Sequence, residues 1–154
     1  MTQSRVLLVA NRTASDAALR DAVRTRTRTR TGWGPVVFHL VVPATPQGLH
    51  RLVDPEVAGR QAAHARLAQA LPLLSEAAGQ DVTGHVGDAN PLSAVADALN
   101  LRGFDEIIVS TLPWRLSRWL RVDLPSKLRG LGVPVRHVTG SETERLDRDL
   151  AEAA

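Results

Sequence analysis

The feature that most constrains this chain is a repeated alternation of short apolar runs with segments of helical character. Five such runs occur along the 154 residues, and each is short enough to be a single strand. Alternation of this kind predicts an α/β domain, with a parallel sheet and helices on both of its faces. The predicted strands cover residues 5–10, 36–42, 82–86, 106–109 and 133–138.

The polarity of each predicted strand indicates its place in the sheet. The first, second and fourth runs are almost wholly apolar, as strands buried on both faces must be. The third run alternates with polar residues, and the fifth contains Pro134, which cannot donate to a strand ladder and favours an edge. These properties are compatible with the strand orders 3-2-1-4-5 and 3-1-2-4-5, among others. In the first order the chain reverses direction between strands one and four, and open α/β sheets bind ligands at such a point.

Capping residues and apolar spacing predict the helices. Thr13 and Asp16 form a capping box that opens a first helix. Pro55 opens a long second helix that runs to about Gly79. Two shorter helices are predicted, one from about Pro91 and one over residues 125–131.

Composition narrows the class of protein. The chain has no cysteine, so it has neither disulfides nor a cysteine nucleophile. No apolar run is long enough to cross a bilayer, so we expect a cytoplasmic protein without a membrane partner. The common nucleotide, hydrolase and zinc motifs do not occur, and the histidines show no ligand spacing. We therefore expect no metal site and no enzyme activity.

An Arg–Thr repeat occupies residues 24–31, where the first predicted helix should end. Threonine is a weak helix former, so the repeat favours a frayed and solvated helix end. The alternative is a contact with a nucleic-acid backbone, but no aromatic residues interleave with the arginines as a base-stacking surface needs. Nucleic acid is therefore not the partner that we expect.

The segment STLPWRLSRWLR, residues 110–121, follows the fourth strand and contains no glycine. Its arginines Arg115, Arg118 and Arg121 are three residues apart, so on a helical turn they would share a face and grip an anion. Its two tryptophans could cover a nucleobase or fill the core. Because Trp119 continues an apolar stripe with later leucines, we favour packing for the tryptophans.

Four stretches of the chain resemble a universal stress protein domain: RVLLVANRTAS, VVFHLVVP, HVGDANPLSAVADALNLRGFDEIIVST and VPVRHV. The resemblance implies a domain over residues 1–139, with a C-terminal helical tail over residues 140–154. It implies an open five-stranded parallel sheet in the order 3-2-1-4-5, the adenine nucleotide alpha hydrolase-like fold. It also implies a homodimer formed through strand 133–138, and a stress-response role compatible with a protein partner.

Members of that family that bind ATP carry an acidic residue after strand one, where this chain has Asn11. They also carry three glycines and a hydroxyl after strand four. The corresponding positions here are Ser110, Pro113, Asp123 and Leu124. Glycines let the backbone approach a phosphate closely, proline removes an N–H donor, and an aspartate repels phosphate oxygens. We therefore expect a non-enzymatic regulatory or interaction module that does not bind ATP in the family's manner.

The alternative function keeps a ligand site and changes its chemistry. The site would bind an adenine nucleotide, ATP included, or another anion through arginine side chains at the reversal between strands one and four. No other cofactor is expected. The candidate ligand-binding residues are Asn11, Thr13, Val41, Val42, Gly87, Asp88, Ser110, Thr111, Arg115 and Arg118.

Overall fold

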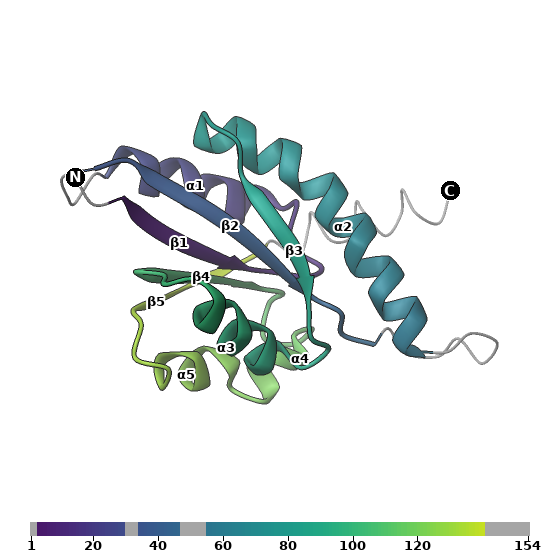
Figure 1. Cartoon of the computed structure of the whole chain (residues 1–154). Coiled ribbons are helices and arrows are strands. Elements are labelled where there is room, and N and C mark those ends of the chain that lie inside the picture. The colour runs from purple at the N-terminus through teal and green to yellow at the C-terminus, as the bar shows by residue number, and fades with distance from the viewer. Residues whose placement is uncertain (1–2, 30–33, 47–54, 141–154) are drawn as a thin grey trace.

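The computed structural model describes residues 3–29, 34–46 and 55–140, in which one parallel sheet is covered by helices on both faces (Figure 1). The strand order is β3-β2-β1-β4-β5, and every neighbouring pair is parallel. This confirms the predicted fold class and the first of the predicted strand orders. The strands are β1 (Ser4–Val9), β2 (Val36–Pro43), β3 (Thr83–Gly87), β4 (Glu106–Thr111) and β5 (Val135–Thr139).

The helices divide between the two faces of the sheet. In Figure 1, α1 and α2 lie on one face, and α3 and α5 lie on the other. Their bounds are α1 (Ala17–Arg28), α2 (Pro55–Ala78), α3 (Pro91–Leu101), α4 (Arg118–Arg121) and α5 (Leu124–Arg129). Among the described helices, none is long and apolar enough to cross a membrane. The predicted helical tail, from residue 141 on, lies outside the described residues.

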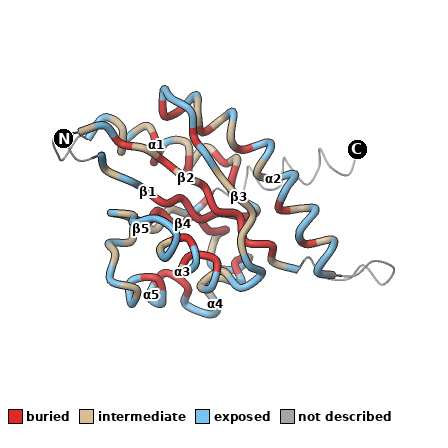
Figure 2. Tube along the Cα trace, in the orientation of Figure 1, coloured by how far each residue is buried: buried red, intermediate tan, exposed pale blue. Residues whose placement is uncertain are grey.

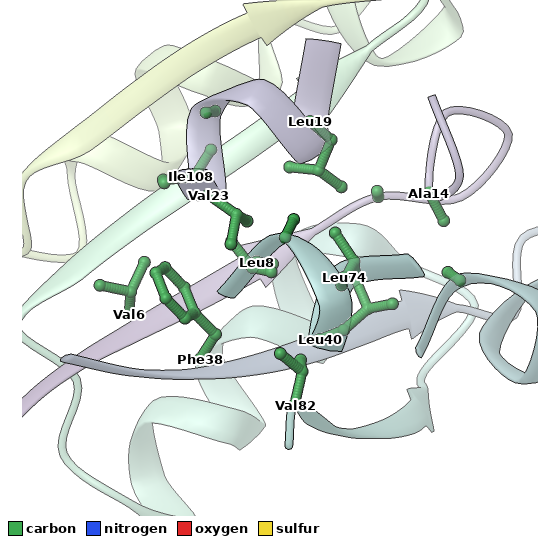
Figure 3. Packing of buried hydrophobic residues seen from close by; sticks show 14 of the residues in the cluster. Val6, Leu8, Ala14, Leu19, Val23, Phe38, Leu40, Leu74, Val82 and Ile108 are labelled. Atoms are coloured by element: carbon green, nitrogen blue, oxygen red, sulfur yellow. The ribbon is translucent and has the colours of Figure 1, made fainter. Parts of the chain in front are cut away.

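The central strand β1 is buried on both sides, which is why its sequence is apolar at every position from Val6 onward. Val6 and Leu8 pack with α1 and α2 on one face, whereas Leu7 and Val9 pack with α3 and α5 on the other. All four side chains have no exposed surface. Figure 2 shows the buried central strands between the helix layers, and Figure 3 shows the α1–α2 side of the core.

The predicted start of the first helix is wrong. Thr13 does not cap it, because residues 11–16 form tight turns in which Ala14 N–H donates to the Asn11 carbonyl and Asp16 N–H donates to the Thr13 carbonyl. The helix begins at Ala17, with Asp16 as the preceding residue. Because the Thr13 hydroxyl does not cap the helix, it can hydrogen-bond across the end of the sheet to Ser110.

The frayed end predicted for the Arg–Thr repeat is also wrong over residues 24–28, which are helical. Arg26 Nε donates to Glu106 Oε2 at 2.7 Å, and this ion pair is largely shielded from water. The Thr27 hydroxyl donates to the Val23 carbonyl one turn earlier. An ion pair to β4 and local hydroxyl bonds thus extend α1 beyond what threonine's helix propensity predicts.

Two histidines meet near the β3 edge, on the face that carries α3. His39 Nε2 lies 2.6 Å from His85 Nδ1, and His39 Nδ1 lies 2.6 Å from Thr83 Oγ1. Burial is the main cause that lowers the pKa of His39 to about 4, and the positive charges of His85 and Arg102 contribute to the same shift. Burial also lowers the pKa of His85. Both rings are therefore neutral near pH 7.

This pair makes stability depend on pH. Because the pKa of His39 is lower in the folded chain than in the unfolded one, the stability it contributes is complete above about pH 6.5 and is lost as the pH falls toward 4. For a half-exposed ring, screening reduces the loss to about 1–2 kcal/mol. Urea unfolding at several pH values should show this loss in the wild type, and a smaller loss in His39→Gln. An identical pH profile for the two proteins would contradict the assignment.

Candidate functional site

The carboxyl ends of the strands surround a hollow that opens to solvent. It lies where the strand order reverses, between the loops that follow β1 and β4. Its lining combines residues 11–13, Thr45 and Pro46 after β2, and residues 110–112 and 116–119. Ligand sites in open α/β sheets form at this point of the fold.

The structure brings five of the ten predicted site residues together in this lining: Asn11, Thr13, Ser110, Thr111 and Arg118. It places the other five elsewhere. Val41 and Val42 are fully buried in the core, on opposite faces of β2. Gly87, Asp88 and Arg115 lie outside the lining.

The floor of the hollow contains a hydrogen bond between two hydroxyls. Thr13 Oγ1 and Ser110 Oγ are 2.6 Å apart, and both residues are buried. Ser110 occupies the position at which the resemblance implies the first phosphate-binding glycine. A hydrogen bond between the ends of β1 and β4 therefore occupies the place where the family pattern has a conformationally free glycine.

Asn11 uses its amide in two directions. Its Nδ2 donates to the Pro43 carbonyl at 2.8 Å, and its Oδ1 accepts from the Arg66 guanidinium on α2. The amide thus joins the end of β1 to the end of β2 and to the helix above them. A carboxylate here would lose the donor and would face the Pro43 carbonyl, which gives a physical reason for asparagine in place of the family's acid.

Thr111 connects the hollow to the edge strand β5. Its Oγ1 lies 2.7 Å from His137 Nε2, and its carbonyl accepts from Gly140 N–H at 2.8 Å. Burial lowers the pKa of His137, and the charge of Arg129 lowers it further, so the ring is neutral near pH 7. Nothing in the sequence indicated this contact, because only the parallel register of β4 and β5 brings the two residues together.

Gly140 allows this corner to close. A Cβ atom at this position would collide with the Asp16 carboxylate and would come within 3.1 Å of the Thr13 methyl group. The chain after β5 can therefore pass against the β1–α1 loop only because residue 140 has no side chain.

The segment after β4 forms a turn followed by one helical turn. Leu116 N–H and Ser117 N–H both donate to the Pro113 carbonyl, at 2.8 and 3.1 Å. The Ser117 hydroxyl then caps α4 by accepting from Leu120 N–H. Pro113 therefore supplies a carbonyl where the family pattern has a glycine, and the turn presents no N–H group at that residue.

This geometry corrects the predicted arginine face. Arg115 lies in the turn before α4, so Arg115, Arg118 and Arg121 do not share one helical surface. Arg118 lines the hollow, and Arg12 lines it from the loop after β1. Arg12 was not among the predicted site residues, because a single arginine after an apolar strand matches no known ligand-binding motif.

The two tryptophans of this segment have different environments. Trp119 lines the hollow and is half-buried against the α3–α5 side of the core, in agreement with the predicted packing role. Trp114 has 66% of its surface exposed. The packing role predicted for both tryptophans is therefore wrong for Trp114.

The position of the third family glycine keeps a glycine-like backbone. Asp123 has φ of 53° and ψ of 48°, in the left-handed region, immediately before α5. Aspartate tolerates this region better than most residues do. The side chain is exposed and lies outside the lining, so the repulsion predicted for it does not act inside the hollow. Within the described residues, no group of three or more His, Asp or Glu side chains is placed to hold a metal ion.

Comparison with solved structures identifies the fold. A universal stress protein family member from Burkholderia pseudomallei matches with a TM-score of 0.59 at 16% identity, over 87% of this chain and 94% of that one. This chain has the universal stress protein fold. A universal stress protein from Archaeoglobus fulgidus matches this fold with a TM-score of 0.57 at 15% identity, over 88% and 93% of the two chains.

A third match is a universal stress protein solved in complex with cAMP. Its TM-score is 0.60 at 15% identity, over 90% of this chain and 98% of that one. No protein-family model matches the sequence, and no curated protein matches it significantly. The likeness therefore lies in the fold.

The hydroxyl pair in the floor makes a testable contribution to stability. Ser110→Ala or Thr13→Val leaves the other hydroxyl buried without this partner, so each should lower the free energy of unfolding by about 1–3 kcal/mol. The double variant should lose less than the sum of the two, because the second change removes the orphaned group. Urea unfolding of the four proteins measures this coupling. Strictly additive losses would show that the two hydroxyls do not stabilise each other.

Proposed function

We propose that this chain is a non-enzymatic regulatory module that binds a small anionic ligand in the hollow between β1 and β4. The observation that carries the proposal is the lining itself, which contains Arg12 and Arg118 together with buried hydroxyl groups. Guanidinium groups bind phosphate and carboxylate oxygens through charge-assisted hydrogen bonds. The apolar ring of Trp119 lies in the same lining and offers a surface for a nucleobase.

A nucleotide with a single phosphate fits this lining better than ATP does. Two arginines can neutralise one phosphate, and the hydroxyls can hydrogen-bond to it. A triphosphate needs the backbone N–H groups that Ser110 and Pro113 do not provide in the family's manner. A protein of the same fold forms a complex with cAMP, a nucleotide with one phosphate. These points support a cyclic or linear nucleoside monophosphate as the ligand class.

Catalysis is not part of the proposal. Thr111 and His137 form a hydroxyl–imidazole contact, but among the described residues no side chain holds the other ring nitrogen of His137. A nucleophile–base pair normally needs such a third group to orient its imidazole. We therefore assign the contact a structural role at the edge of the hollow.

Calorimetric titration of cAMP, AMP and ATP tests the ligand assignment. We expect the monophosphates to bind, ATP to bind no more tightly than AMP, and each nucleotide to be recovered unhydrolysed. Arg118→Ala should weaken binding about tenfold or more, because a charge-assisted bond is lost. Arg28→Ala removes an exposed arginine at the far end of α1 and is the matched control, with no expected effect. Tight ATP binding that survives Arg118→Ala would contradict the proposal.

We also propose that the module is a homodimer formed through β5. This strand is an edge of the sheet, and its outward backbone groups are available to a second strand. Gly140 donates to β4, so the alternating ladder directs the N–H group of Thr139 away from β4. Val135 and Val138 add half-buried apolar surface at the same edge.

Sedimentation equilibrium tests the dimer. Thr139→Pro should convert a dimer to a monomer, because it removes an outward N–H group while the bonds to β4 remain. Arg136→Ala, on the same strand, keeps every backbone donor and should remain dimeric. A wild-type protein that is monomeric at all concentrations would refute the interface.

A further inference from the structure

An exposed cluster at the mouth of the hollow is made of Trp114, Arg115 and Arg121, together with Arg118, which also lines the hollow. We call this cluster the Arg–Trp rim. All three arginines are exposed, and Trp114 has 66% of its surface in solvent. Across residues 3–29, 34–46 and 55–140, no carboxylate forms an ion pair with any of the three arginines. The rim is therefore cationic, with an uncovered aromatic ring at one end.

The turn at Pro113–Leu116 explains why Trp114 is uncovered. The Pro113 carbonyl accepts from Leu116 N–H, which places Trp114 and Arg115 at the corner of the turn. Leu116 and Trp119 line the hollow, so the hydrophobic requirements of this segment are met without Trp114. Tryptophan and arginine are both enriched at binding interfaces, so an exposed tryptophan next to exposed arginines points to an interaction site.

The positive charge continues from the hollow onto the rim. Arg118 lines the hollow, and Arg115 lies three residues earlier in the turn, outside the lining. The Arg121 guanidinium donates to the Arg115 carbonyl at 3.4 Å, so α4 and the turn are held together. Asp123 is the nearest acidic residue in sequence, and residues 113–123 therefore keep a net charge of +2, from three arginines and one aspartate.

We propose that the hollow and the Arg–Trp rim together form a two-part site for a ligand with two or more nucleobases joined by phosphodiester linkages. One nucleotide occupies the hollow, with its 5′-phosphate on Arg118. The phosphodiester that links it to the next nucleotide lies against Arg115 and Arg121, and the next base stacks on Trp114. The inference rests on the proposed nucleotide site in the hollow, and adds to it the part of the ligand that extends outside.

The shape of the rim favours this ligand over a membrane surface. The helix α4 has only four residues, and its apolar side chains Trp119 and Leu120 are half-buried. An interfacial helix needs a much longer continuous apolar face. The Arg–Thr repeat does not extend the rim, because Arg26 pairs with Glu106 at the amino end of β4, the opposite end of the strand from the hollow.

Titration with 5′-phosphorylated oligodeoxyadenylates of increasing length tests the proposal. In the wild type, the step from mononucleotide to dinucleotide should tighten binding about tenfold, which is typical of one base stacked on an aromatic ring. Trp114→Ala should abolish this gain and leave mononucleotide binding unchanged, whereas Trp114→Phe should keep most of it. A plateau at the dinucleotide indicates a free dinucleotide ligand, and a continued rise with length indicates a nucleic-acid strand.

Arg28→Ala provides the matched charge control, since it removes one exposed arginine from the opposite end of the molecule. Arg115→Ala should reduce the dinucleotide gain and flatten its dependence on salt, and Arg28→Ala should do neither. Equal affinity for mono- and dinucleotide in the wild type, or equal effects of the two arginine variants, would overturn the proposed role of the rim. If the protein bound anionic phosphatidylglycerol vesicles in a Trp114-dependent manner and showed no dinucleotide gain, the proposed role of the rim would be overturned as well. Absence of all mononucleotide binding would instead refute the function proposed for the hollow.

Discussion

The reversal of strand order around β1 is the constraint on which the rest of this structure depends. Because β2 lies on one side of β1 and β4 lies on the other, the loops that leave their carboxyl ends diverge and a hollow remains between them. The Thr13–Ser110 hydrogen bond spans the floor of that hollow at 2.6 Å. The fold thus creates the space, and the hydroxyl pair joins its two walls.

Side chains stand at positions around this space where the ATP-binding pattern has glycines or an acidic residue. Asn11 joins the ends of β1 and β2 through its amide, and Ser110 pairs with a hydroxyl where the pattern has a glycine. Pro113 contributes only a carbonyl to the turn that follows. Arg12 and Arg118 then supply positive charge from side chains. Side chains of this kind can hold one phosphate, but they do not reproduce a row of backbone N–H donors.

The sequence predicted the fold well because the strand pattern depends on burial. A strand covered on both faces must be apolar throughout, so β1, β2 and β4 were identified with small errors at their ends. Pro134 likewise indicated that β5 is an edge, although the strand begins at Val135, immediately after this proline. The end of α1 was missed, because the Arg26–Glu106 pair joins residues far apart in sequence and no local propensity reports it.

The site was predicted only in outline. Topology alone placed the loops after β1 and β4 together, which selected Asn11, Thr13, Ser110 and Thr111. The contacts that these residues make depend on the register between strands, and register is not visible in a single sequence. The separate environments of Trp114 and Trp119 depend on a turn whose hydrogen bonds converge on one carbonyl. A crystal structure with bound AMP tests the central claim most directly: the account predicts the phosphate on the guanidinium groups of Arg12 and Arg118. A phosphate held by backbone N–H groups after β4, with both arginines turned away, would contradict it.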